Sequence, residues 1–500
     1  MICSMLKRVT TGVALLLALT SGTPRGVAQD WCPPTCGDAI CGEGPIDGCG
    51  EVGCGDSNGC GTLDVHELFN AVAGNESIFA GLKNNKLGGM TYSVGGELRH
   101  RFMNESNRLR PPGGNAEYSL WRFTPYMKMQ FNDRIGGFVE GIDASAWQEG
   151  DAPYSRVGID VNRMDFLRYY GEIALINDKD RTLKYRYGRQ FLKYGGQRLL
   201  SPLAWSNTFR NFEGHKLVYS SSDWDADAFM MNSVNAAAGG SGFGVTSLDS
   251  ADNDRSISGI YTTYKGLEQS KLDLYWLYSD EDNASVARQD GSRHTLGMRL
   301  AGSQAIKGCD KVVGTWKWDL EGAYQFGNDN FGGVNQDVSA GMVAAALGYT
   351  FNDVRWTPGF NAFYYWSSGS DAGSGTNNTF YTMYPLGHAY WGLIDNFSGQ
   401  NLQDVGLTLS AKPHKKLSVA ATYHHFQKAN DADNVYNIVG APIGVPNGDG
   451  HLGDELDLVA TIPVTTNFNV QAGYFWFFYG GALAGRNDAR QFYLQTSWKF

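Results

Sequence analysis

Apolar and polar side chains alternate along many short segments of this chain, and the alternation restricts the folds that it can adopt. In residues 315–326, TWKWDLEGAYQF, Trp316 and Trp318 share one face while Lys317 and Asp319 lie on the other. A repeat of two is the repeat of a β-strand, whose successive side chains point to opposite faces. A soluble sheet rarely sets tryptophans against a row of charges in this way. We therefore predict an all-β fold, a transmembrane antiparallel β-barrel whose strands have one face in lipid and one in water.

The end of the chain follows the same pattern. Residues 491–500, QFYLQTSWKF, place Phe492, Leu494 and Trp498 on one face and finish on Phe500. A last strand that closes on an aromatic residue resembles the assembly signal of bacterial outer-membrane β-barrels, so we expect the outer-membrane assembly machinery as a partner. The alternative is an ordinary edge strand of a soluble sheet.

The connections between the alternating segments are short and long in turn. Short polar links lie at 132–134, 177–181, 221–223, 266–269, 352–355, 412–415 and 465–467. Longer links lie at 104–116, 148–162, 191–214, 232–254, 280–292, 367–401, 428–453 and 479–488. Tight turns at one end and long loops at the other are typical of an outer-membrane barrel. Residues 86–500 are predicted to form about 18 strands, enough to enclose a water-filled lumen.

The composition agrees with this fold class. Aromatic residues make up 13% of the chain, and 64 Gly stand against 15 Pro. Beyond the N-terminal region, no apolar run approaches the roughly 20 residues of a membrane-spanning helix. A membrane-spanning form of this chain must therefore be a closed sheet in the lipid bilayer. The formal net charge of -10 argues against nucleic acid as a partner.

The N-terminus has the features of a secretory signal peptide. Lys7 and Arg8 precede an apolar stretch at 13–20, and small residues suited to cleavage follow as far as Ala28. The stretch is too short to span a membrane, so residues 1–28 are predicted to be removed after export.

Residues 29–85 form a segment rich in glycine and cysteine, which we expect in the periplasm. Its cysteines are Cys32, Cys36, Cys41, Cys49, Cys54 and Cys60. In an exported segment without a CxxC pair, these favour disulfides over zinc, and Cys309 is left as the odd thiol. The connectivity cannot be read from the sequence, which also leaves open whether the segment plugs the barrel or tethers it to partners.

Within this segment, residues 56–67, DSNGCGTLDVHE, fit the spacing of an EF-hand calcium loop. The candidate ligands are Asp56, Asn58, the carbonyl of Thr62, Asp64 and Glu67. Cys60 replaces the usual oxygen ligand. The alternative is an Asx-rich turn that leads into a short helix. Calcium is the only cofactor that the sequence suggests.

Residues 187–217 carry a series of motifs in a fixed order. They are Gly188, Arg189 and Gln190; Tyr194, Gly195, Arg198 and Leu199; Trp205, Asn207 and Arg210; and Phe212, Glu213 and Gly214. Residues 388–395, 401–404, 423–426, 455–457 and 473–478 continue the series. In this order the motifs resemble the alginate export family of outer-membrane barrels. The resemblance covers the chain from about Met90 to Phe500, and the Cys-rich start lies outside it.

The resemblance implies an 18-stranded barrel whose lumen, lined by Arg and Lys, passes a polyanionic uronic-acid polysaccharide outward. Independently, alternation places basic residues on the wet face: Arg99, Arg101, Arg122, Lys128, Arg168, Lys184, Arg186, Arg299 and Lys317. Glu97, Glu172, Asp273, Asp319 and Glu321 share that face. The excess of basic groups is typical of a pore that attracts anions. The alternative is that these charges are solvated or paired across neighbouring strands.

Three further arginines belong to the motif region. Strict alternation points Arg189 toward lipid, so we expect it at the outer strand end or turned inward by a bulge at Gly188. With Arg198 and Arg210 it is a candidate cluster for gripping carboxylates. The competing hypothesis is that these arginines pair with Glu213 or Asp395 and pin loops inside the barrel.

The function that these observations favour is a bacterial outer-membrane channel that passes anionic solutes or an acidic polysaccharide such as alginate, with the N-terminal segment and the C-terminus in the periplasm. A general diffusion porin and a structural barrel anchored by the Cys-rich segment are alternatives. An enzyme is disfavoured because His424, His425 and Asp395 are the only suggestive grouping.

Overall fold

The structure is a computed structural model that describes residues 79–500 apart from the gaps 110–113, 150–157, 236–247, 283–289, 310, 331–333, 372, 374 and 444–447. The signal peptide, the cysteines up to Cys60 and the candidate calcium ligands lie outside the described residues. Cys309 is described and is an exposed free thiol.

Nearly all regular structure in the described residues is β-strand. The long strands are β2 (Met90–Ser106), β3 (Asn115–Gln130), β4 (Ile135–Gln148), β5 (Asn162–Asn177), β6 (Arg181–Gln190), β7 (Phe212–Ser221), β8 (Trp224–Asn235), β9 (Ser250–Tyr264), β10 (Ser270–Glu281), β11 (Gly291–Lys307), β12 (Val312–Asp329), β13 (Gln336–Phe351), β14 (Gly359–Ser367), β16 (Leu402–His414), β17 (Leu417–Lys428), β18 (His451–Pro463), β19 (Phe468–Tyr479) and β20 (Ala489–Lys499). Two short strands, β1 (Asn85–Leu87) and β15 (Thr376–Asn377), add to this sheet, and η2 (Gly387–Ala389) and η3 (Gly481–Leu483) are single 3₁₀ turns. No helix in the described part of the chain is long and apolar enough to cross a membrane.

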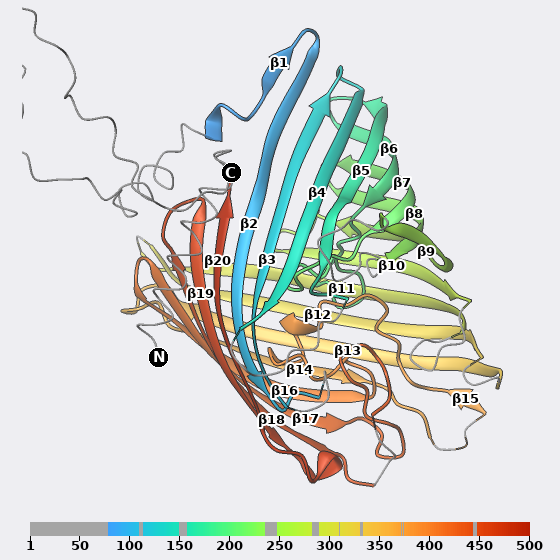
Figure 1. The fold of residues 1–500 in the computed structure, drawn as a ribbon, viewed down its shortest axis with the longest axis vertical. Helices are drawn as coiled ribbons and strands as arrows, with labels where there is room; N and C mark the ends of the chain where they lie inside the picture. The colour runs from blue at the N-terminus through green and yellow to red at the C-terminus, as the bar shows by residue number, and fades with distance from the viewer. Residues whose placement is uncertain are drawn as a thin grey trace, which may run out of the picture. The chain divides into compact units, whose positions relative to one another are not determined.

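The long strands close into a ring. Each pairs antiparallel with the next along the chain, and β2 pairs with β20 through partners such as Leu98 and Trp498 (Figure 1). Of the 20 strands in the sheet, all but β1 and β15 take part, which leaves a closed barrel of 18. Closure leaves no unpaired edge, as the interior of a bilayer requires. The predicted barrel and its strand number are confirmed.

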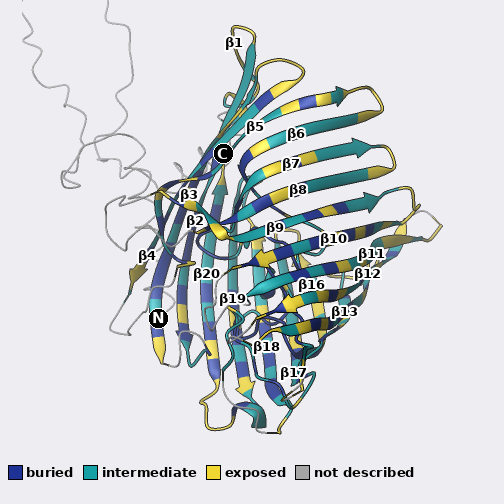
Figure 2. Ribbon diagram, turned by 90° about the vertical axis from the view of Figure 1, so that its right-hand side faces the viewer, coloured by how far each residue is buried: buried dark blue, intermediate teal, exposed yellow. Residues whose placement is uncertain are grey.

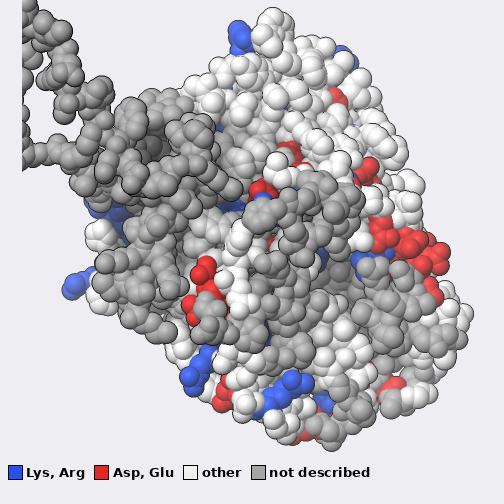
Figure 3. Space-filling model, viewed as in Figure 1, with Lys and Arg blue, Asp and Glu red and all other residues white. Residues whose placement is uncertain are grey.

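Apolar and charged residues are distributed over the outer and inner faces of the barrel wall as the alternation predicts. Leu175 of β5 and Leu347 of β13 are each 50% exposed on the outside. Facing inward, Arg122 of β3 and Glu321 of β12 are only 3% and 6% exposed. Buried and exposed positions accordingly alternate in bands along the strands (Figure 2). On the face seen in Figure 3, uncharged atoms cover most of the described surface, with Asp and Glu gathered at its right-hand side. Apolar groups outside and charges inside are the arrangement of a protein solvated by lipid.

The connections differ in length between the two ends of the barrel. Residues 222–223 and 415–416 are tight turns, whereas residues 191–211 and 368–401 form long loops at the opposite end. The chain reaches β2 and leaves β20 at the short-turn end, where the backbone N–H of Phe500 donates to Gly96 O over 3.1 Å. The predicted alternation of turns and loops is therefore present.

Candidate functional site

Two long loops make polar contacts with the inner face of the barrel at several places. We call residues 191–211, between β6 and β7, the first inserted loop, and residues 368–401, between β14 and β16, the second inserted loop. Both begin and end on strands of the wall, and their side chains meet inward-facing residues of other strands.

The first inserted loop spans the lumen. On one side, Arg99 of β2 donates to the carbonyl of Ser206 over 2.6 Å, and Arg122 of β3 donates to the same carbonyl over 3.0 Å. On the other side, Arg198 of the loop reaches Glu321 of β12 over 2.7 Å. Half of the ring separates β3 from β12. A loop anchored to both must cross the interior.

Asn207 fixes the loop where it meets the wall. Its side-chain amide nitrogen lies 3.0, 3.1 and 2.8 Å from the backbone carbonyls of Trp121, Ser145 and Asp160. Buried carbonyls need donors, and one amide supplies them here at the junction of β3, β4 and the loop.

The second inserted loop pairs with the first. The backbone N–H of Ser201 donates to Tyr384 O over 2.9 Å, and the N–H of Tyr384 donates to Leu199 O over 3.0 Å. Farther along, the N–H of Ile394 donates to a carboxylate oxygen of Glu455, on β18, over 2.8 Å. The two loops therefore form one unit that is held to several parts of the wall.

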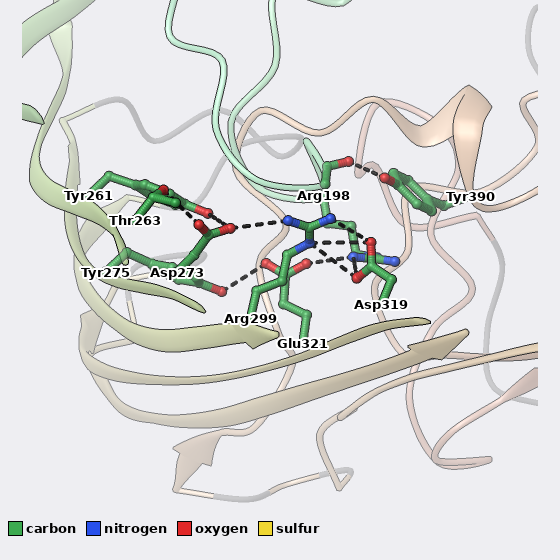
Figure 4. A network of polar contacts seen from close by, with 10 residues as sticks. Arg198, Tyr261, Thr263, Asp273, Tyr275, Arg299, Asp319, Glu321 and Tyr390 are labelled. Atoms are coloured by element: carbon green, nitrogen blue, oxygen red, sulfur yellow. Dashed lines mark hydrogen bonds and ion pairs between the residues drawn. The ribbon is translucent and has the colours of Figure 1, made fainter. Parts of the chain in front are cut away.

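A network of arginines and carboxylates anchors this unit to β10, β11 and β12 (Figure 4). Asp319 accepts from Arg198 at 3.1 Å and from Arg299 at 2.7 Å. Arg299 also reaches Asp273 at 3.1 Å. Burial alone would lower the pKa of Arg198, but its interactions with Glu321, Tyr390 and Asp319 together outweigh burial, and the net effect is a raised pKa. Arg198 is therefore a permanent cation, neutralised by carboxylates of the wall.

A cavity of about 420 Å³ lies between the inserted loops and the wall at β2 and β3. Arg101 lines it, with its guanidinium 3.4 Å from the ring centre of Trp205, and that ring stacks on His388 at 3.6 Å. Arg101 donates to the amide oxygen of Gln495 over 2.9 and 2.7 Å. Among the described residues it has no ion pair with a carboxylate.

Arg210 lines the same cavity. It donates to the carbonyl of Pro385 over 3.2 Å and lies 5.4 Å from the ring centre of Tyr384. Burial lowers the pKa of Arg210 to about 10, so the side chain stays protonated at neutral pH. Within the described ranges Arg210 also lacks a carboxylate partner.

Of the acidic residues that line this cavity, Glu105 and Asp395 have partners other than Arg101 and Arg210. Glu105 pairs with Arg108 at 2.5 Å, and Asp395 pairs with His388 at 2.9 Å. The positive charge of Arg101 and Arg210 is thus not neutralised by a direct contact with either.

Most of the other predicted basic residues pair with neighbouring strands. The pairs are Arg122 with Glu97 at 3.0 Å, Arg168 with Glu140 at 2.5 Å, Arg186 with Glu172 at 2.8 Å, and Arg299 with Asp319 and Asp273. Lys128 and Lys317 are exposed and have no ion pair within the described part of the chain. Contact of any of these residues with a solute stays a prediction.

The arginine cluster expected from the motif region is not assembled. Arg189 lies at the end of β6, just after Gly188 with φ +129°, and pairs with Glu213 at 3.1 Å. Arg189, Arg198 and Arg210 share no partner. The competing hypothesis holds for the Arg189–Glu213 pair, while Arg198 pairs with β12 instead.

Sequence reasoning missed several buried carboxylates on the inner face. They are Glu140, Glu281, Asp404, Glu455 and Asp457. The alternation of inward and outward residues along β16 and β18 was the signal that could have predicted the inward positions of Asp404, Glu455 and Asp457. With them included, inward-facing basic residues lie on β2, β3, β5 and β6, and inward-facing carboxylates lie on β10, β12, β16 and β18. An excess of basic groups over the lumen as a whole stays a prediction.

The grouping that suggested an enzyme is also not assembled. His424 faces inward and pairs with Asp404 at 2.9 Å, whereas His425 pairs with Asp454 at 2.8 Å. Asp395 contacts His388 instead of either.

A closed sheet with an apolar exterior, a charged interior and loops inserted in its lumen defines an outer-membrane β-barrel channel. The sequence profile of the alginate export family matches residues 90–496, and the chain belongs to that family. The family and the fold are those of channels and not of enzymes.

Solved structures of outer-membrane proteins share the fold. OccK8 (OprE) of Pseudomonas aeruginosa superposes with a TM-score of 0.51 at 13% identity, covering 82% of this chain and 98% of that one. OprD of the same organism gives 0.51 at 13% identity, with 82% and 93% covered. OccAB2 of Acinetobacter baumannii gives 0.54 at 13% identity, with 82% and 98% covered. No curated protein sequence matches the chain.

Proposed function

We propose that the protein passes anionic solutes through its lumen, with an acidic polysaccharide such as alginate as the expected cargo. The observation that carries the proposal is that Arg101 and Arg210 line one cavity without a carboxylate partner among the described residues. A guanidinium that already pairs with a carboxylate has its charge largely neutralised and attracts a further anion less strongly. These two contact neutral oxygens instead, so a uronate carboxylate can bind them without displacing a charge.

The unequal distribution of charge on the barrel wall also supports the passage of anions beside Arg101. Basic residues lie on one arc of the wall (β2, β3, β5 and β6) and carboxylates on another (β10, β12, β16 and β18), and the order of the strands places β3 opposite β12 and β6 opposite β16. A polyanion is attracted to the first side and repelled from the second, and the low-dielectric wall strengthens both effects. The solute path therefore runs beside Arg101, away from β12.

The size of the cavity sets a condition on the cargo. A volume of about 420 Å³ suits a small ligand such as one or a few sugar residues. Passage of a long polysaccharide requires the inserted loops to move, because both cross the interior. We infer that the loops are the gate of this channel.

Block of ion current in planar bilayers tests the proposal. We expect oligouronates to block the current of the wild type more strongly than neutral oligosaccharides of the same length. The double variant Arg101→Gln, Arg210→Gln should lose this preference. Arg181→Gln is the matched control, because Arg181 lies in an exposed pair with Asp178 at the short-turn end.

Other outcomes of this experiment favour one of the two alternative functions, a general diffusion porin or a structural protein. Equal block by acidic and neutral sugars, or block unchanged in the double variant, contradicts the proposal and favours a general diffusion porin. A folded barrel that conducts no ions favours a structural protein of the envelope.

We also propose that the short-turn end faces the periplasm, as in outer-membrane barrels generally. Cys309 is exposed in the turn between β11 and β12 at that end, and Val439 is exposed in a loop at the other. A membrane-impermeant thiol reagent on intact cells should label Val439→Cys and leave Cys309 unlabelled, whereas both react after permeabilisation. Labelling of Cys309 alone in intact cells contradicts this orientation.

A further inference from the structure

Three potential metal ligands meet on the outer face of the wall, at the end that carries the long loops. They are His425 of β17 with His451 and Asp454 of β18. His424 and Phe426 are buried toward the lumen, so His425 between them points away from it. His425 and Asp454 are partners in the register of β17 and β18. Side chains at partner positions share a face and lie close together.

The ligand atoms have the spacing that a small divalent cation needs. His425 Nδ1 lies 2.8 Å from Asp454 Oδ1, and His451 Nε2 lies 3.2 Å from Asp454 Oδ2. The ligand atoms of the three residues all lie within 4.8 Å of one another. A tetrahedral zinc ion with bonds of about 2.0–2.2 Å sets its ligand atoms roughly 3.3 Å apart. Small rotations of the three side chains therefore suffice to enclose an ion.

Neighbouring groups hold these side chains in place. The amide of Gln427 lies 3.0 Å from the second ring nitrogen of His425, and the hydroxyl of Tyr423 donates to Asp454 Oδ1 over 2.6 Å. The backbone N–H of His451 donates to Asp449 Oδ1 over 2.9 Å. A hydrogen bond to the second nitrogen of a ligating imidazole fixes its tautomer and orientation. With the amide of Gln427 turned over, its oxygen accepts from Nε2–H and leaves Nδ1 free for a metal.

Solvent reaches the group. The side chains of His425, His451 and Asp454 are 37%, 38% and 27% exposed. An ion can therefore enter without opening the barrel, and water can supply the fourth ligand.

The arrangement differs from those of other histidines on the outer face. His294 lies among the rings of Trp276, Tyr278 and Phe326, and His215 lies beside Tyr185 and Tyr187. Neither meets a carboxylate in a described ion pair. Within the described residues, no other group of three His, Cys, Asp or Glu side chains brings its ligand atoms so close.

We propose that His425 Nδ1, His451 Nε2 and a carboxylate oxygen of Asp454 bind a divalent transition-metal ion such as Zn²⁺ at the outer rim of the barrel. Two imidazoles and one carboxylate select such ions over Ca²⁺ and Mg²⁺, which prefer sites built from oxygen. In the bound state the ion links β17 to His451 at the end of the 429–450 loop. The three side chains lie on the outer face of the wall, outside the lumen.

Calorimetric titration of the untagged, detergent-solubilised full-length mature protein with ZnCl₂ tests the site. The cysteines of the N-terminal segment are also zinc ligands, so the informative quantity is the difference between variants. We expect His451→Gln and Asp454→Asn each to bind one equivalent fewer than the wild type, or to bind the last equivalent roughly tenfold or more weakly. His294→Gln, which changes an outward histidine without a carboxylate, is the matched control and should bind as the wild type does.

X-ray absorption at the zinc edge gives a second readout. The spectrum of the wild type minus that of Asp454→Asn should show imidazole nitrogen and oxygen scattering without sulfur. Unchanged stoichiometry and affinity in both variants, or equal competition by Ca²⁺, would overturn the proposal. Heat-modifiable migration in gels confirms that each variant is folded, so a loss of binding is not a loss of the barrel.

Discussion

Arg198 and Glu321 form an ion pair of 2.7 Å between a loop that follows β6 and a strand on the far side of the barrel. The two residues are 123 positions apart in the sequence. Their side chains are 6% and 4% exposed, so the pair is shielded from water and from salt. This contact holds the first inserted loop across the lumen.

Loss of this anchor should loosen the gate. Removing one member of a buried pair costs about 3–5 kcal/mol because the other charge stays buried and unpaired. Arg198→Ala is therefore expected to raise single-channel conductance and current noise. Arg181→Ala, which breaks a pair whose members are 58% and 60% exposed, should leave both unchanged. Identical traces for the two variants would contradict the anchoring role of Arg198.

Asn207 should contribute to stability without taking part in charge selectivity. Its amide serves three backbone carbonyls and is 1% exposed. Asn207→Ala leaves buried acceptors unpaired and should lower the free energy of unfolding by about 1–3 kcal/mol. Denaturant unfolding in detergent measures this change, and Asn177→Ala, which removes an exposed contact to Asp133 O, is the control. A loss in Asn207→Ala no larger than the loss in the control would contradict this role of Asn207.

The docking of the second inserted loop should weaken in acid. Burial lowers the pKa of His388 below its ordinary value, despite the opposing charge of Asp395. The docked loop therefore binds fewer protons than the undocked loop once the pH falls below about 6.5. The stabilising contribution is complete above that pH and is lost as the pH falls toward the lowered pKa.

Conductance as a function of pH measures this effect. We expect more frequent opening in the wild type as the pH is lowered from about 7 to about 5, and a flatter dependence in His388→Gln. A wild-type response in the opposite direction would show that protonation of His388 favours docking.

Phe500 should matter for assembly of the barrel. It stacks on Phe123 at 6.2 Å, and its backbone carbonyl accepts from the N–H of Gly96 over 3.1 Å where β2 and β20 close the ring. Phe500→Ala is expected to lower the amount of folded protein in the outer membrane. Phe478→Ala removes an outward ring that is 49% exposed at the other end of the wall and should have a smaller effect. Quantitative blotting of membrane fractions measures the amount of folded protein for both variants.

Local sequence patterns were sufficient to predict the wall of the barrel. Each strand repeats every two residues, so Leu347 and its neighbours in β13 reveal their faces without any distant contact. The same rule places Glu455 and Asp457 of β18 inward, where both are buried.

The interior could not be predicted in the same way. For Arg198 the sequence leaves two hypotheses open: a cluster with Arg189 and Arg210 that grips carboxylates, or a pair with Glu213 or Asp395. Its partners are instead Asp319 and Glu321, which depend on how far the loop reaches across the ring. Likewise, Arg101 meets Gln495 only because β2 closes on β20. Such contacts arise from ring closure and loop packing and leave no periodic signal in the sequence.

The reversal potential in a salt gradient tests most directly whether Arg101 and Arg210 create an anion path. The account predicts anion selectivity in the wild type and a shift toward cations in the double variant Arg101→Gln, Arg210→Gln, because the carboxylates of β10, β12, β16 and β18 remain. Cation selectivity in the wild type, or a reversal potential unchanged by the double substitution, would contradict it.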